Sequence, residues 1–135
     1  MRKKPKWLSV ELVKAIHLNV LSDHGGLAGR INESALASSL ARRQQLMNYG
    51  EPKPGVHELA ASYGFGLARN HCFSDGNKRV ALMAMYVFLG MNNIELEVAE
   101  PEAVLIIQDL AAGHLSEAEL AAWIKLCSVR WVNPV

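Results

Sequence analysis

One stretch of the sequence, from Asn70 to Arg79, gathers side chains that could carry out a reaction. It reads NHCFSDGNKR and places His71 four residues before Asp75. An imidazole exchanges a proton near neutral pH and could take one from an incoming hydroxyl. A carboxylate supplies the hard oxygen by which magnesium is held beside the phosphates of a substrate. The spacing therefore indicates a pocket in which His71 acts as a base and Asp75 as a metal ligand.

The four residues after Asp75 have the features of an anion site. Gly76, Asn77, Lys78 and Arg79 stand where the apolar pattern predicts the start of a buried helix. The first backbone N–H groups of a helix lack partners, and with the helix dipole they attract anions. Two cations in a first turn oppose that dipole by a few tenths to about 1 kcal/mol. A phosphate bound close to Gly76 would remove this penalty.

A purely structural interpretation of the same residues stays open at this point. Asp75 or Asn77 could cap a core helix, His71 could be satisfied between helices, and the two cations could face solvent. Short motifs also match by chance. Spacing alone does not decide between the two interpretations.

Apolar residues recur at helical spacing along most of the chain and predict six helices. Ser9 and Asn32 are expected to cap the first two, Ser116 with Glu119 to form a capping box, and Gly90 to end the fourth helix. Small residues in the third helix would let a neighbouring helix approach closely. The expected ranges are 9–24, 32–47, 56–69, 77–89, 101–112 and 116–127, with a turn-rich loop or flap at 48–55 and a short extended piece at 94–98.

Composition limits the number of domains and the class of partner. At 135 residues, half of them hydrophobic, the chain fits one globular core. The 14 Lys and Arg face 13 acidic residues, so no excess positive charge favours direct nucleic-acid binding. No apolar run has the length of a membrane span, and the start lacks a cleavage signal. We expect a cytoplasmic protein whose Cys72 and Cys127 stay reduced.

The segment 71–79 resembles the Fic-family signature H-P-F-x-x-G-N-G-R, and more closely its death-on-curing variant H-x-F-x-D-G-N-K-R. Four further stretches resemble that family: GRINESALASSLA, SYGFGLARNH, ALMAMYVFLGMNN and the ending G-x-L-S-x-x-E-L-A-x-W. The likeness therefore extends over nearly the whole chain from Leu8 to Leu126. It implies an all-α, single-domain Fic fold of about six helices, with a central buried helix after the active-site loop. The expected domain covers residues 8–130, behind a basic tail at 1–7.

The resemblance also implies roles for the motif residues. In the family the histidine activates the target hydroxyl, the acidic residue holds magnesium, and the Gly-Asn-Lys-Arg helix start holds nucleotide phosphates. By this likeness His71 is catalytic, Asp75 binds the metal, and the cofactors are ATP and Mg²⁺. Phosphate binding falls on residues 76–79, which are Gly76, Asn77, Lys78 and Arg79.

Two departures from the general Fic signature bear on the reaction. Lys78 replaces the glycine of members that transfer AMP, and Leu82 stands where those members carry a second arginine. In the family both features accompany death-on-curing proteins, which transfer the terminal phosphate of the nucleotide. A kinase is therefore expected, with AMP transfer and a catalytically silent antitoxin-binding module as the alternatives. Cys72, in place of the usual proline, is interpreted as a loop substitution.

The likeness further implies a toxin of a type II toxin-antitoxin system. The chain has no threonine, and no serine precedes a glutamate at the spacing of the family's inhibitory S/T-x-x-x-E-G/N helix. We therefore expect the toxin to be inhibited by a Phd-like antitoxin, whose C-terminal helix lies in a groove on the toxin. The loop from Tyr49 to Pro54 resembles in position the flap that aligns the target. The implied target is a threonine of elongation factor Tu, whose modification would halt translation.

Overall fold

The computed structural model describes residues 5–49 and 53–130. In these ranges the chain forms six helices and a two-stranded sheet, which confirms the predicted all-α class. The elements are α1 (Val10–His24), α2 (Glu33–Tyr49), α3 (Val56–Arg69), α4 (Asn77–Met91), β1 (Ile94–Leu96), α5 (Glu100–Ala112), α6 (Glu117–Cys127) and β2 (Ser128–Arg130).

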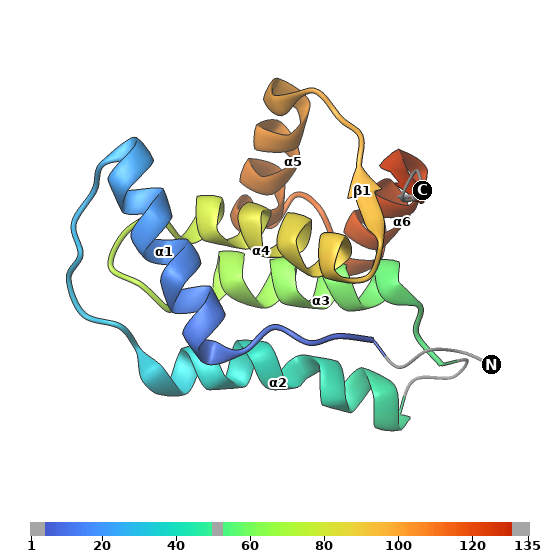
Figure 1. Cartoon of the computed structure of the whole chain (residues 1–135), viewed down its shortest axis with the longest axis horizontal. Coiled ribbons are helices and arrows are strands. Elements are labelled where there is room, and N and C mark those ends of the chain that lie inside the picture. The colour runs from blue at the N-terminus through green and yellow to red at the C-terminus, as the bar shows by residue number, and fades with distance from the viewer. Residues whose placement is uncertain (1–4, 50–52, 131–135) are drawn as a thin grey trace, which may run out of the picture.

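Helices α3 and α4 lie side by side in the middle of the molecule (Figure 1). Helix α2 packs along α3, and α1 crosses one end of α4. Helix α5 packs on α4 and α6 on α3, so the central pair is covered by the other four helices. The turn between α3 and α4 is the loop that carries the motif, and the packing of this pair therefore fixes its position.

Small residues bring the central helices together, as the sequence predicts. A Cβ atom at Gly64 of α3 would lie 2.4 Å from Sδ of Met85 in α4. On another side of α3, a Cβ at Gly66 would lie 3.2 Å from Cα of Ser39 in α2. A side chain at Gly64 would have to displace Met85, and one at Gly66 would need α2 to shift by a few tenths of an ångström, so the glycines let α3 approach both neighbours closely.

Helix α4 departs from the prediction at its end. It continues through Gly90 to Met91, and Asn92 closes it by donating its side-chain amide to the Phe88 carbonyl at 2.8 Å. The left-handed residue is Asn93, with φ of 63°, and not Gly90. The prediction that Gly90 ends the helix was wrong because an asparagine, which tolerates that conformation, supplies the stop. The helix is also not enclosed on every side, since Met83 is 43% exposed.

Helix α2 differs from the prediction in its length. It runs to Tyr49, so the predicted loop begins later than residue 48, and residues 50–52 of that loop lie outside the described residues. Leu36 and Leu40 are buried, whereas Leu46 is half-buried. A polar residue, Ser39, shares the fully buried face.

The predicted caps at the starts of three helices are confirmed. The Ser9 hydroxyl accepts from Leu12 N, the Asn32 side chain accepts from Ala35 N, and Ser116 forms the capping box with Glu119. Strand β1 occupies part of the predicted extended piece and pairs antiparallel with β2, a strand that the sequence pattern did not predict.

The described residues before the first helix are packed on the domain. Of the predicted tail, residues 1–4 lie outside the described ranges. The Lys6 backbone exchanges two hydrogen bonds with the Asn92 side chain, and Trp7 stacks on Phe88 of α4. Among the described residues, no helix is both long and apolar enough to cross a membrane.

Candidate active site

The loop between α3 and α4 opens into a cavity of about 720 Å³. The carboxyl end of α1 and Ala111 of α5 form part of its wall. All the residues that the sequence assigns to the site line this cavity, namely His71, Asp75, Gly76, Asn77, Lys78 and Arg79. Their juxtaposition supports the functional interpretation of the motif over the purely structural one.

His71 has an accessible side chain on an unusual backbone. The residue is exposed and lines the cavity. Its φ is 51°, in the left-handed region that few non-glycine residues adopt and that costs backbone energy. No other residue in the described ranges is hydrogen-bonded to its ring. The ring is thus available to an incoming hydroxyl, whereas its backbone is held in place.

Asp75 is exposed at the cavity wall and is partly engaged by the backbone. Its Oδ1 accepts from Gly76 N at 2.9 Å, and its Oδ2 accepts from Leu27 N at 3.3 Å. Each carboxylate oxygen retains a further lone pair. In the described residues no cluster of three or more His, Cys, Asp or Glu side chains occurs. The site therefore fits an ion held by one carboxylate together with substrate phosphates, which is how magnesium is commonly bound.

The helix start is arranged for an anion at its backbone. Gly76 precedes α4 with φ of 84°, and no side chain caps the helix. Lys78 is exposed, and Nη1 of Arg79 lies 3.8 Å from a carboxylate oxygen of Glu100, a distance that makes a weak surface pair. The first N–H groups of α4 and these two cations are therefore open to a phosphate.

The Asn77 side chain is hydrogen-bonded within the loop. Its Oδ1 accepts from Phe73 N at 3.0 Å, and its Nδ2 donates to Phe73 O at 2.8 Å. Both polar atoms of the amide are thus engaged by the loop. Asn77 closes the loop on itself, and its backbone N–H is the group left for a phosphate.

A buried histidine that the motif does not contain supports the loop from α1. The His17 ring stacks on Phe73 with centroids 4.0 Å apart and planes 16° apart, and both residues are buried. Its Nε2 lies 3.1 Å from the Asp75 carbonyl oxygen. A carbonyl only accepts, so Nε2 carries the proton and donates. Phe73 points into the core, and His17 fixes the backbone of Asp75.

Comparison with known proteins places the chain in a family. The Fic/DOC family model matches residues 7–89. Over 114 residues the chain is 31% identical to "Protein kinase doc" of Escherichia phage P1, covering 84% of this chain and 89% of that protein. The chain belongs to the Fic/DOC family. It is also 35% identical over 68 residues to "Toxin Doc" of Mycolicibacterium smegmatis, covering 50% of this chain and 52% of that protein.

The two positions that distinguish death-on-curing proteins from other Fic/DOC members lie in contrasting environments. Leu82 is buried in the core of this Fic/DOC domain, where a longer charged side chain could not be accommodated without repacking. Lys78 is exposed at the cavity and adds a positive charge beside the start of α4. These environments agree with the resemblance to the death-on-curing branch, which both named relatives confirm.

Cys72, which replaces the usual proline of the Fic signature, is a free and fully buried thiol. Burial is the largest influence on the pKa of the Cys72 thiol, and it raises that pKa. A thiol that is buried and mostly protonated is a poor nucleophile. The structure thus favours the interpretation of Cys72 as a loop substitution.

Proposed function

We propose that this chain is a Doc toxin that transfers the terminal phosphate of ATP to a hydroxyl of a protein. One observation carries the proposal: a single cavity holds an unengaged histidine ring, a carboxylate and a cationic helix start. The kinase name of the phage relative supports phosphate transfer over other reactions of the family.

In the proposed step, the His71 ring accepts the proton of the target hydroxyl. The hydroxyl oxygen forms a bond to the terminal phosphorus while the bond from that phosphorus to the bridging oxygen breaks, and ADP leaves. The products are a phosphoprotein, ADP and one proton, which the imidazolium returns to solvent. The first N–H groups of α4, with Lys78 and Arg79, bind the phosphates and offset their charge.

Magnesium is expected to be held by Asp75 together with the phosphates. Bound there, the ion would neutralise charge on the phosphates. The Gly76 and Leu27 amides keep the Asp75 carboxylate directed along the cavity wall through their hydrogen bonds.

The proposed partners are an antitoxin and a translation factor. The toxin name of the mycobacterial relative supports a toxin-antitoxin pair. We expect a Phd-like antitoxin, and a threonine of elongation factor Tu as the first candidate target. Expression of the chain alone should arrest bacterial growth, and co-expression of a small protein encoded beside it should restore growth. Harmless overexpression would count against a toxin.

The deciding experiment follows the label of ATP into protein. The purified chain is incubated with Mg²⁺, a bacterial lysate and ATP labelled in the γ- or the α-phosphate. Label on a protein from the γ-position alone supports the kinase, and label from the α-position identifies AMP transfer instead. Absence of label in both arms, with toxicity unchanged by His71→Ala, favours a silent binding module.

A matched control separates loss of the base from loss of the fold. His71→Ala is expected to abolish labelling. His57→Ala replaces a histidine at the opposite end of α3, outside the cavity lining, and should leave labelling unchanged. Equal loss in both variants would indicate unfolding and not a catalytic role for His71.

A further inference from the structure

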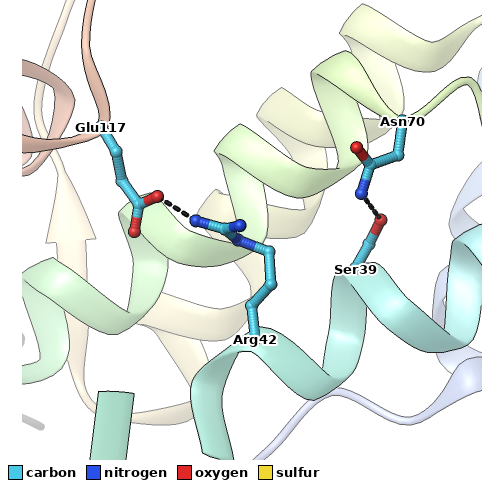
Figure 2. A network of polar contacts seen from close by, with 4 residues as sticks. All are labelled: Ser39, Arg42, Asn70 and Glu117. Carbon is cyan, nitrogen blue, oxygen red and sulfur yellow. Dashed lines mark hydrogen bonds and ion pairs between the residues drawn. The ribbon is translucent and has the colours of Figure 1, made fainter. Parts of the chain in front are cut away.

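The strained backbone of His71 is flanked by two residues that contact the same buried side chain. Asn70, immediately before it, donates its side-chain amide to Oγ of Ser39 in α2 at 2.8 Å (Figure 2). Cys72, immediately after it, has its Sγ 3.5 Å from the same oxygen. Ser39 is fully buried.

The hydrogen-bonding capacity of the Ser39 hydroxyl determines the direction of these contacts. Its oxygen lies 2.8 Å from the Ala35 carbonyl, which can only accept, so the hydroxyl proton is donated there. The oxygen retains two lone pairs, one for the Asn70 amide and one for the Cys72 thiol, which must then be the donor. The hydroxyl is therefore saturated, and both of its acceptor sites hold neighbours of His71.

The backbone reinforces this arrangement from the start of α2. Asn32 N donates to the Cys72 carbonyl at 2.7 Å, and Ile31 pairs with Phe73 in an isolated antiparallel bridge. Residues on both sides of His71 are thus held by α2. His71 itself has no ring partner in the described parts of the chain, so its placement depends on its neighbours.

We propose that Ser39 is a positioning residue, which holds His71 in the left-handed conformation that directs its ring into the cavity. The inference rests on the proposed function in that His71 is taken as the base. The hydrogen bonds of Ser39 in the described residues go to Ala35, Asn70 and Cys72 and not to the helix start or Asp75, so its effect should fall on turnover and not on nucleotide affinity. The chemistry it serves is proton removal from the target hydroxyl.

The test is a double-mutant cycle on the proposed transfer reaction. Ser39→Ala and Asn70→Ala are each expected to lower kcat roughly 10- to 100-fold, the scale of a misplaced catalytic group. KM for ATP should stay unchanged. If both act through their shared hydrogen bond, the double variant should be no slower than the slower single variant. Ser38→Ala, an exposed serine next in sequence, is the matched control and should behave as the unmodified chain.

A second readout is independent of activity. NMR relaxation dispersion at the His71 amide reports microsecond-to-millisecond exchange between backbone states. We expect exchange to be absent in the unmodified chain and present in Ser39→Ala and Asn70→Ala. If the unmodified chain transfers no phosphate, the proposed function fails, while this measurement still tests whether Ser39 holds His71.

The outcomes that overturn the proposal are specific. Unchanged kcat in both single variants, multiplied effects in the double variant, or a His71 amide that Ser39→Ala leaves unaffected would each exclude a positioning role. If Ser39→Ala fails to fold, Asn70→Ala, at an exposed position, decides the question by the same kinetic and NMR measurements.

Discussion

The two ends of the active-site loop are held by different helices and by different kinds of contact. The His71 end is fixed by α2 and the residue before it. The Ser39 hydroxyl accepts from Asn70 and Cys72 on either side of the histidine, and Asn32 N donates to the Cys72 carbonyl. The Asp75 end is fixed by α1, through the His17 ring that stacks under the loop and donates to the Asp75 carbonyl.

This division matches the two tasks that the site must perform. The end held by α2 carries the proposed base, and the end held by α1 carries the proposed metal ligand and leads into the proposed phosphate site. Loss of an α2 contact should therefore slow the reaction, whereas loss of an α1 contact should weaken nucleotide binding. The comparison can be tested by substitutions at each end.

The largest effect on stability is expected at His17. His17→Ala removes a buried ring and should lower the free energy of unfolding by about 3 kcal/mol, as truncation of buried rings does. His17→Phe keeps the stack and loses the hydrogen bond, at a cost of about 1 kcal/mol. Urea unfolding of both variants measures the difference. Equal losses in the two variants would show that stacking on Phe73 contributes little.

Removal of the charge at Asp75 should weaken the binding of Mg·ATP. Asp75→Asn is expected to weaken Mg·ATP affinity by at least the roughly 10- to 100-fold that loss of an outer-shell metal partner costs. Calorimetric titration measures it, with Asp109→Asn, at an exposed carboxylate outside the cavity lining, as the control. Unchanged affinity would remove Asp75 from the metal site.

Ser74, midway along the loop, should matter to neither task. Its hydroxyl accepts from Arg30 N at 3.0 Å and donates to Arg30 O at 3.2 Å, both at the surface. Ser74→Ala should cost about 1 kcal/mol of stability or less, with turnover and ATP affinity unchanged. A loss of turnover comparable to that of Ser39→Ala would mean that the loop is held as one piece and not at two separate ends.

The smallest effect concerns the Cys72 thiol, whose accessibility reports on the α2 contacts. Iodoacetamide should modify the half-buried Cys127 before Cys72, and site-resolved mass spectrometry measures both rates. Ser39→Ala should accelerate modification of Cys72, and His17→Phe should not. Equal acceleration in both variants would contradict separate anchoring of the two ends.

The same thiol should make stability fall with pH. Burial raises the pKa of Cys72, so the folded state favours the protonated thiol. The contribution of this thiol to the free energy of unfolding is fully present below the ordinary thiol pKa of the unfolded chain. It is lost as pH rises through the raised pKa of the folded state. Modification should also accelerate with pH, because the thiolate is the reactive form.

The sequence predicted the motif residues and the six helices, because both are encoded by local patterns. The apolar spacing of α3 and α4 depends only on nearby residues. The same holds for the capping box that Ser116 forms with Glu119 at the start of α6. The end of α4 was mispredicted at Gly90, since the stop depends on the Asn92 side chain reaching back to Phe88.

The supports of the loop could not be predicted in the same way. His17 lies 58 residues from the carbonyl that it contacts, and Ser39 lies 31 residues from Asn70. Each stands on the apolar face of its helix, where a polar residue signals that a partner exists without identifying it. Only the packing of α1 and α2 against the loop shows which residues are the partners of His17 and Ser39.

The most direct measurement is the mass of the target protein after incubation with unlabelled Mg·ATP and the purified chain. The target is the protein that labelling identifies, with elongation factor Tu examined first. We expect the target to gain one phosphate group with the unmodified chain and nothing with His71→Ala. A gain of one AMP group, or a phosphate that still arrives with His71→Ala, would contradict phosphate transfer by this site.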